Sequence, residues 1–244
     1  MKKILVVDNH PVMLKFMSNL LENKGHQVLT APDGLSALDI LKTNIPNVIF
    51  ADLVMPNISG EKLCRIIRSK PELKEVFLVI LSAVAVENET NFLDYGADAC
   101  IAKGPFDKMA DHIVQILEHL DTVRDYKIPK EILGRESLYG RQISKELLAS
   151  KNHFEATLNN ISEGILELTE NLKIIYANPS AVSIIGIPEE TLLSINFIKL
   201  FHKKHHKKYP LIITITGYGT SFWRLQDGTN NFGTGLNFDG SGFR

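Results

Sequence analysis

Two patterns in the first half of the chain predict an α/β fold with a parallel β-sheet. Four apolar runs have the composition of buried strands, and the stretches between them show helical periodicity. Strands that alternate with helices form a parallel sheet. The predicted strands are KILVVDN, NVIFAD, FLVILS and CIAK, which end at Asp8, Asp52, Ser82 and Lys103.

The helices are predicted from apolar residues that recur on one helical face. These residues are Val12, Phe16 and Leu20 after the first strand, Leu35, Leu38 and Leu41 before the second, Leu63, Ile66 and Ile67 before the third, and Met109, Ile113, Ile116 and Leu120 after the fourth.

The polar residues at the strand ends are expected to converge on one crevice. Open parallel sheets bind ligands outside the carboxyl ends of their strands, so residues distant in sequence meet there. Two carboxylates, a hydroxyl and an ammonium would come together from Asp8, Asp52, Ser82 and Lys103.

Each of these four groups fits one step of phosphoryl transfer. A carboxylate such as Asp52 can act as the nucleophile and form an aspartyl phosphate. Asp8 can hold a hard divalent cation, for which Mg²⁺ is the best match. Lys103 can neutralise charge on the transferred group, and Ser82 can donate a hydrogen bond to it. Asp52 alone could merely cap a loop, but the four roles together favour this chemistry.

The first half of the chain resembles the receiver domain of two-component response regulators. The string DLVMPNISG has the family spacing D-x-x-M-P-x-x-x-G, and Asp8, the LSA at 81–83, the GADAC at 96–100 and Lys103 follow in family order. The resemblance implies a doubly wound, flavodoxin-like sheet of five strands over residues 1–122. It also implies that Asp52 is the phosphoacceptor, that a histidine kinase or phosphotransfer protein supplies the phosphoryl group, and that the Val54 carbonyl binds the metal.

The chain departs from the family pattern at three positions. Asn9 stands where receivers usually carry a second acid, so it would be a weak ligand and Mg²⁺ affinity should fall. Cys100 occupies the position of the usual switch aromatic, which leaves Ser82 and its loop to carry any switch. The proline after Lys103 is displaced by Gly104, so a cis bond could form only at Gly104–Pro105.

Residues 123–153 are predicted to form a helical linker, because charged and turn-prone residues follow Leu120. From Ile143 to Ile161 the apolar spacing indicates a helix. This helix could be a short coiled coil that joins two protomers, or it could pack on its own domain. Both interpretations remain open.

The segment FEATLNNISEGILELTENLKIIYANPSAVSIIGIPEETLLSINFIKLF resembles the opening half of a PAS sensor domain. EGILEL and KIIYAN are expected to form an antiparallel hairpin, followed by helices after Asn178 and at Pro188. Residues 154–210 are therefore predicted to be a smaller, partial α+β PAS-like module. LIITIT has the alternation of one strand, and residues 211–244 are expected to be an atypical glycine-rich tail.

Composition favours a cytoplasmic signalling protein. A net charge of −1 argues against a nucleic-acid surface, and no apolar stretch is long enough to cross a membrane. The run at MKKILVV is stopped by polar residues and lacks a signal-peptide cleavage site. Cys64 and Cys100 are expected to be free, buried packing residues, as in a reducing compartment.

The predicted function is that of a response regulator in a phosphorelay, phosphorylated on Asp52 and signalling through the linker and the PAS-like module. The chain is expected to catalyse only its own phosphorylation and dephosphorylation, and homodimerisation is a family-level expectation. Two alternatives stay open. One is a pseudo-receiver that binds partners without phosphorylation, since Asn9 replaces an acid. The other is a PAS-based sensor of a small molecule.

Overall fold

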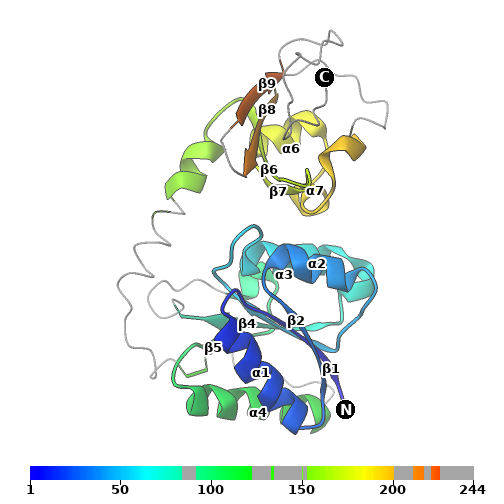
Figure 1. The fold of residues 1–244 in the computed structure, drawn as a ribbon, viewed down its shortest axis with the longest axis vertical. Helices are drawn as coiled ribbons and strands as arrows, with labels where there is room; N and C mark the ends of the chain where they lie inside the picture. Colours follow the sequence, from blue (N-terminus) through cyan, green and yellow to red (C-terminus); the bar gives the residue numbers. More distant parts are fainter. Residues whose placement is uncertain are drawn as a thin grey trace.

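The computed structural model contains an α/β unit that is followed along the chain by a smaller α+β unit (Figure 1). Described are residues 1–83, 92–122, 133–134, 150, 153–200, 211–216 and 221–225. No described helix is both long and apolar enough to span a bilayer.

The first unit is built on a parallel sheet of five strands, which confirms the predicted fold class. The strand order is β2-β1-β3-β4-β5, and every neighbouring pair is parallel. This is the doubly wound, flavodoxin-like order, in which the chain reverses its direction of winding between β1 and β3. The strands are β1 (Lys3–Val7), β2 (Gln27–Ala31), β3 (Val48–Asp52), β4 (Phe77–Ser82) and β5 (Ala99–Ala102).

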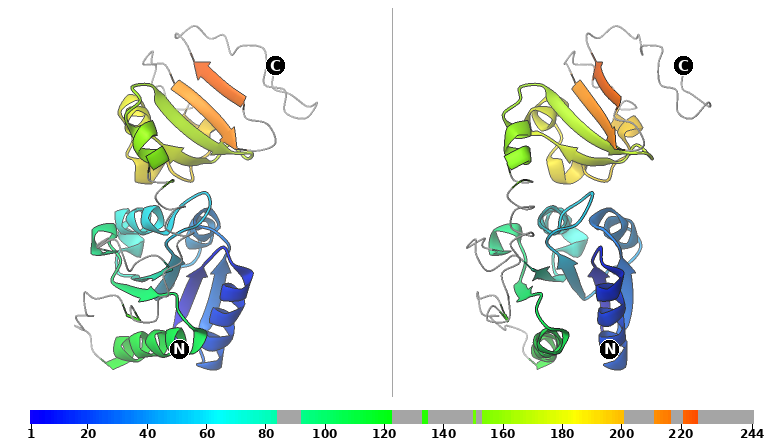
Figure 2. Two further views of the ribbon diagram at one scale, coloured as in Figure 1. Left: turned by 90° about the vertical axis from the view of Figure 1, so that its left-hand side faces the viewer. Right: turned by 60° about the vertical axis from the view of Figure 1, so that its left-hand side comes forward.

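Helices cover both faces of this sheet (Figure 2). Helices α1 (Pro11–Asn23) and α4 (Phe106–Thr122) pack on one face, and α2 (Gly34–Leu41) and α3 (Gly60–Ser69) pack on the other. Two short 3₁₀ helices, η1 (Pro71–Leu73) and η2 (Phe92–Tyr95), flank β4. The strands are nearly all apolar because both faces are buried.

Alternation along each strand divides the buried side chains between two cores. On β1, Ile4 and Val6 point to the α1–α4 face, whereas Leu5 and Val7 point to the α2–α3 face. All four are fully buried. Burial of an aliphatic side chain contributes about 1.5–3 kcal/mol, so the two cores hold the strand ends in fixed positions.

The second unit contains a four-stranded sheet with the order β7-β6-β8-β9. The predicted hairpin is present as β6 (Gly164–Thr169) and β7 (Ile174–Ala177), which pair antiparallel. The predicted strand at LIITIT is β8 (Leu211–Thr216), which pairs parallel with β6. A further strand, β9 (Ser221–Leu225), pairs with β8 and lies where the sequence predicted only a glycine-rich tail.

Short helices follow the hairpin of the second unit. They are α6 (Pro179–Ile185), α7 (Glu189–Leu192) and the 3₁₀ helix η4 (Phe197–Leu200). Helix α6 begins with proline and ends at Gly186, whose φ of 71° is left-handed, as expected of a helix C-terminus.

The buried side chain of Asn178 joins the elements of the second unit. Its Oδ1 accepts hydrogen bonds from the backbone N–H of Ile165 in β6 (2.8 Å) and of Ala181 in α6 (2.9 Å). Its Nδ2 lies within hydrogen-bond distance of three backbone carbonyls, those of Leu158, Ile161 and Glu163. The asparagine of the Ala-Asn-Pro motif therefore connects the entering chain, a central strand and a helix.

Only part of the predicted linker lies within the described residues. Residues 153–159 are helical, as the periodicity from Ile143 to Ile161 predicts. Phe154 in this helix is 63% exposed. The rest of the predicted linker helix, apart from residue 150, lies outside the described residues, and so does the glycine-rich stretch after Leu225.

Candidate functional site

Two aspartates lie at the point where the sheet reverses its winding. Asp8 directly follows β1, and Asp52 is the last residue of the adjacent strand β3. The Asp8 side chain is fully buried, and its Oδ1 accepts a hydrogen bond from the His10 backbone N–H at 2.8 Å. Ligands of doubly wound sheets bind at this position.

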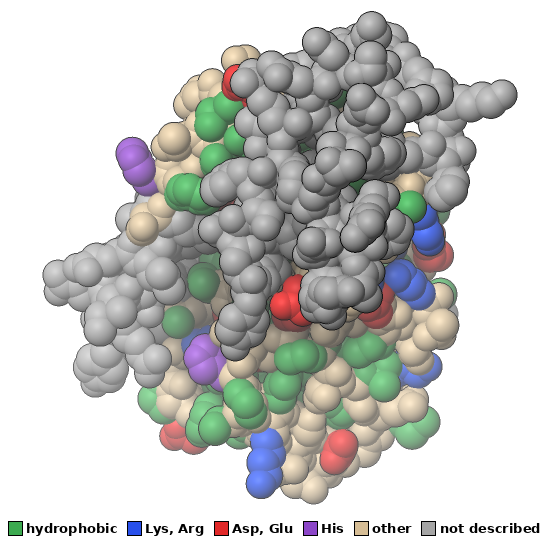
Figure 3. Space-filling view, turned by 45° about the horizontal axis from the view of Figure 1, so that its top comes forward, with side chains coloured by type: hydrophobic (Ala, Val, Ile, Leu, Met, Phe, Trp, Pro, Cys, Tyr) green, Lys and Arg blue, Asp and Glu red, His purple; other side chains and the backbone are tan. Residues whose placement is uncertain are grey.

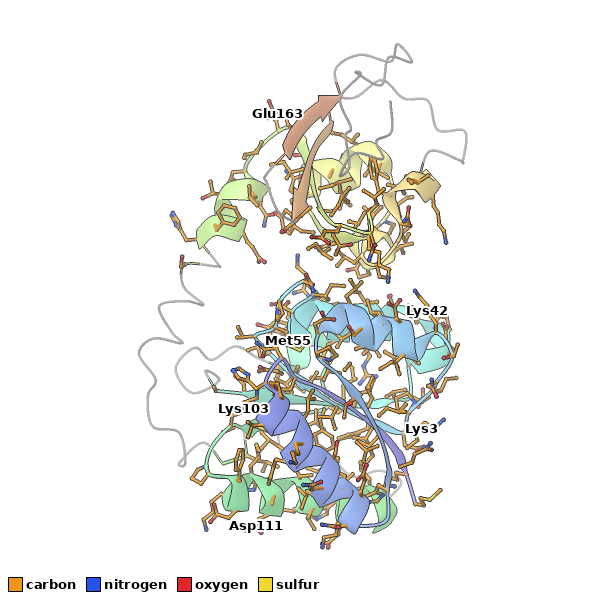
Figure 4. All side chains as sticks on the ribbon, in the orientation of Figure 1. Lys3, Lys42, Met55, Lys103, Asp111 and Glu163 are labelled. Atoms are coloured by element: carbon orange, nitrogen blue, oxygen red, sulfur yellow. The ribbon has the colours of Figure 1, made fainter. Side chains whose placement is uncertain are left out.

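Lys103, one residue past β5, bridges both carboxylates. Its Nζ lies 2.6 Å from Asp8 Oδ2 and 2.8 Å from Asp52 Oδ2. The lysine side chain is 12% exposed, so the three charges interact with little screening by solvent. In Figure 4, Lys103 and Met55 lie at one end of the sheet, opposite Lys3 at the start of β1. The structure thus brings together three of the four predicted groups.

Burial raises the pKa of Asp52 above its ordinary value, although the charge of Lys103 and its hydrogen bond act in the opposite direction. The neighbouring charge of Asp8 raises the pKa further. The Asp52 carboxylate is consequently destabilised by its surroundings relative to water. Binding of a cation would relieve the repulsion between the two aspartates.

Asp8, Asp52 and His10 each place one ligand atom in a cluster whose atoms all lie within 4.8 Å of one another. Two buried carboxylates suit Mg²⁺, which binds through one or two carboxylates together with water and phosphate oxygens. His10 precedes the first helical residue, Pro11, and its ring is exposed. Asn9 is also exposed at the rim. The donor set therefore fits the ion that the resemblance implies.

The remaining predicted site residues lie on the same edge of the sheet. Ser82 is fully buried at the end of β4, and its backbone carbonyl accepts a hydrogen bond from the Lys103 N–H at 2.8 Å. The Val54 N–H donates to Asp52 Oδ1 at 3.4 Å. The loop after Ser82 was predicted to carry the switch together with that serine. Residues 84–91 of this loop lie outside the described residues. The Gly104–Pro105 bond is trans.

The glycine of the D-x-x-M-P-x-x-x-G motif has a steric role. A Cβ on Gly60 would collide with the backbone carbonyl of Asp52, and the Gly60 N–H donates to the Leu53 carbonyl at 3.1 Å. Helix α3 therefore begins in direct contact with the backbone of the proposed phosphoacceptor. Ser59 precedes this helix and caps it by accepting from the Lys62 N–H at 3.4 Å.

Sequence reasoning missed a contact that fixes the same loop. Asn57 has a φ of 61° and its Nδ2 donates to Asp33 Oδ2 at 2.9 Å. Asp33 also caps α2 through the Ser36 N–H at 2.7 Å. Asparagine tolerates left-handed backbone, so its presence in the sequence can indicate a turn. The sequence gives no sign that its partner is Asp33 at the start of α2.

The GADAC motif has a structural role in this chain. Gly96 has a φ of 80° and its carbonyl accepts from Arg68 Nε at 2.7 Å. The Asp98 carboxylate accepts from Arg68 Nη2 at 2.6 Å and from the Leu78 N–H at 2.7 Å. Cys100 is buried, as predicted, and burial raises the pKa of its thiol to about 12.

Comparison with known families identifies both units. Residues 4–117 match the family model of the response regulator receiver domain. The first unit is a receiver domain. Residues 152–240 match the model of the PAS fold, so a PAS domain follows the receiver. The PAS match includes β8 and β9 and extends well past residue 210, where the sequence placed the boundary of a partial module.

Relatives with this receiver fall into two groups. The chain is 28% identical over 189 residues to the "Probable transcriptional regulator ycf27" of Galdieria sulphuraria, covering 76% of this chain and 62% of that protein. It is 36% identical over 100 residues to the "Sensor histidine kinase RcsC" of Escherichia coli K12, covering 41% of this chain and 10% of that protein. The chain thus spans less than two thirds of either relative.

Two solved structures that match part of this chain are named as response regulators. The phosphorylated cyanobacterial phytochrome response regulator RcpA is 25% identical, with a TM-score of 0.46, over 50% of this chain and 94% of that chain. The response regulator TrrA from Thermotoga maritima in complex with Mg²⁺-BeF is 27% identical, with a TM-score of 0.42, over 48% of this chain and 99% of that chain.

Proposed function

We propose that the receiver accepts a phosphoryl group on Asp52 from a histidine kinase or a phosphotransfer protein and signals through its PAS domain. The observation that carries this proposal is the position of Lys103, whose ammonium touches both Asp8 and Asp52 at the winding reversal of the sheet. An ammonium in this place can follow charge that develops on a transferred phosphoryl group.

In the proposed reaction an Asp52 carboxylate oxygen attacks phosphorus, and the bond from phosphorus to the donor nitrogen breaks. Lys103 moves from the aspartates to the new phosphoryl oxygens, and Ser82 donates a hydrogen bond to one of them. Mg²⁺ would supply charge neutralisation and is held in this proposal by Asp8, Asp52 and the Val54 carbonyl, with Asn9 as a weak ligand. The activity is limited to self-phosphorylation and self-dephosphorylation.

The proposed output is a protein contact in the cytoplasm rather than binding of a nucleic acid or a membrane. The net charge is −1, and on the described part of the face in Figure 3 the Lys and Arg side chains are scattered among hydrophobic and acidic ones. Non-specific binding to nucleic acid requires several cations that meet successive phosphates. The ycf27 relatives carry the name of transcriptional regulators, but this chain continues instead with a PAS domain.

A pseudo-receiver is the second candidate, because Asn9 replaces one acid and lies exposed at the rim of the site. With one fewer carboxylate, Mg²⁺ affinity falls, and the site could serve only as a fixed ion pair. In that case a partner protein binds the receiver surface without any phosphorylation of Asp52.

Intact-mass measurement separates the two candidates. The purified chain is incubated with a small-molecule phosphodonor and Mg²⁺, beside Asp52→Asn as the matched control. We expect a gain of one phosphoryl group in the wild type that is absent from the variant and from samples with a chelator. A folded wild-type chain that gains no mass in excess Mg²⁺ would rule out the phosphorylation model and favour the pseudo-receiver.

A further inference from the structure

A lysine on the receiver contacts an acidic and an aromatic residue of the PAS domain. Lys62, in the first turn of α3, forms an ion pair with Glu189 of α7 at 2.9 Å. Its ammonium also lies 4.6 Å from the ring centroid of Tyr176 in β7, within the range of a cation–π contact. The lysine side chain is only 18% exposed.

Three glutamates place negative charge near Tyr176. Burial raises the pKa of Tyr176 to about 12, and the charges of Glu155, Glu189 and Glu167 raise it in the same direction. Burial raises the pKa of Glu167 as well, while the charge of Lys62 opposes that shift. Lys62 therefore interacts with two PAS carboxylates, those of Glu189 and Glu167, and with the aromatic ring of Tyr176.

A second ion pair and an apolar contact extend this interface. Lys173 Nζ, from the turn before β7, lies 2.7 Å from Asp39 Oδ2 on α2. The buried residues of the α2–α3 side and those of the PAS sheet belong to one continuous hydrophobic cluster. Both views of Figure 2 place the PAS domain over α2 and α3. The interface thus has an apolar centre with two ion pairs.

The phosphoacceptor is joined to this interface through the start of α3. Gly60 packs against the Asp52 backbone so closely that no side chain fits, and Lys62 lies two residues further along the same helix. The Lys62 N–H is itself held by the Ser59 cap. Displacement of the loop that follows Asp52 therefore displaces the Lys62 ammonium as well.

We propose that the α2–α3 face is the output surface of this receiver, that Lys62 latches the PAS domain onto it, and that phosphorylation of Asp52 releases the latch. The second part rests on the proposed function. Phosphorylation replaces the single negative charge of the Asp52 carboxylate by an acyl phosphate of about −1.5 to −2, so negative charge increases beside the first turn of α3. Packed elements respond to such a change by switching between discrete arrangements, so the PAS domain changes its docking as a unit.

The docking is tested in the full-length chain by pulsed EPR distances between spin labels at Asp111→Cys and Asn160→Cys. Both sites are exposed, one on each domain. The native cysteines Cys64 and Cys100 are buried, and burial raises the pKa of each thiol to about 12, so the labels go to the introduced sites. The unphosphorylated chain should give one narrow distance distribution.

Charge reversal decides whether Lys62 is the latch. Lys62→Glu and Glu189→Lys should each broaden the distribution, and the double variant should restore the narrow peak. Arg65→Glu is the control, because Arg65 lies one turn along the same helix and pairs with Glu61 inside the receiver at 2.9 Å. Circular dichroism checks that each variant is folded. An unchanged distribution in Lys62→Glu, or a double variant that stays broad, overturns the role of Lys62 as the latch, and a broad distribution in the unphosphorylated wild type overturns the docking.

Release by phosphorylation is tested in the same labelled chain with a phosphodonor and Mg²⁺, with intact mass recorded on the same sample. We expect the narrow peak to broaden in proportion to the phosphorylated fraction of the chain. A phosphorylated chain with an unchanged peak overturns the release but leaves the proposed function in place. A chain that gains no phosphoryl group overturns the proposed function and the release together, while the wild-type distribution still decides the docking and the charge reversal still decides the latch.

Discussion

Replacing Asn178 by alanine should destabilise the PAS domain selectively, because this buried side chain joins three parts of it. The change removes the acceptor of two backbone N–H groups and the donor to three backbone carbonyls. Neutral hydrogen bonds contribute about 1 kcal/mol each, and a lost helix cap costs about the same. Since one amide nitrogen is shared among three carbonyls, we expect a loss of about 3–5 kcal/mol.

The assay uses the only tryptophan of the chain, Trp223, which lies in β9 of the PAS sheet. Its fluorescence during urea unfolding reports on the PAS domain, while far-ultraviolet circular dichroism reports on both domains. Asn178→Ala should move the fluorescence midpoint to lower urea. Asn160→Ala is the control, because the Asn160 side chain is exposed and donates a hydrogen bond to the Ala156 carbonyl. Its substitution should change the free energy of unfolding by no more than about 0.5 kcal/mol.

A loss smaller than about 1 kcal/mol in Asn178→Ala would refute the reasoning, since it would mean that water replaces the hydrogen bonds at no cost. An equal loss in Asn160→Ala would refute it as well, because exposure would then make no difference.

Three further predictions concern the receiver. Asp52→Asn should raise the free energy of unfolding at neutral pH in a chelator: burial raises the pKa of Asp52, so its ionised form costs stability above that pKa. Thermal melts should show this gain shrinking as the pH falls towards 4, and a variant less stable than wild type at pH 7 would contradict it. Gly60→Ala should lose about 1–3 kcal/mol and slow phosphorylation, because its Cβ meets the Asp52 carbonyl; an unchanged melting temperature and labelling rate would exclude that clash. Cys64 and Cys100 should resist thiol reagents at pH 8 until the chain unfolds, because burial raises the pKa of each thiol to about 12; fast labelling of the native chain would disagree.

The fold of the receiver was predictable because its strands and helices carry strong local patterns. Four of its five strands were recognised as apolar runs, and both cysteines were recognised as packing residues that the structure buries. In the PAS domain the hairpin and β8 were predicted, but β9 was not. The run SFWRL is short and is followed by glycines, so its strand depends on pairing with β8 rather than on its own pattern.

The candidate site was predictable at the level of residues but not of contacts. Asp8, Asp52, Ser82 and Lys103 all lie at the carboxyl edge of the sheet, because parallel strands all end on one side. Three contacts could not be predicted from the sequence, because each depends on a partner in another element. They are the ion pairs of Lys103 with both aspartates, the position of His10 near Asp52, and the hydrogen bond from Asn57 to Asp33.

The sequence by itself determined the alternation of strands and helices and the polar residues that end four of the receiver strands, since burial and turn chemistry are local properties of the chain. Its motifs also indicated the two kinds of domain. Only the tertiary structure decided which charges meet. Lys103 pairs with Asp8 across 95 residues, and Lys173 pairs with Asp39 across 134. Such contacts follow from how whole elements pack, and neither partner's local sequence encodes the other. For the same reason, only the tertiary structure shows that the PAS domain contacts the α2–α3 face of the receiver.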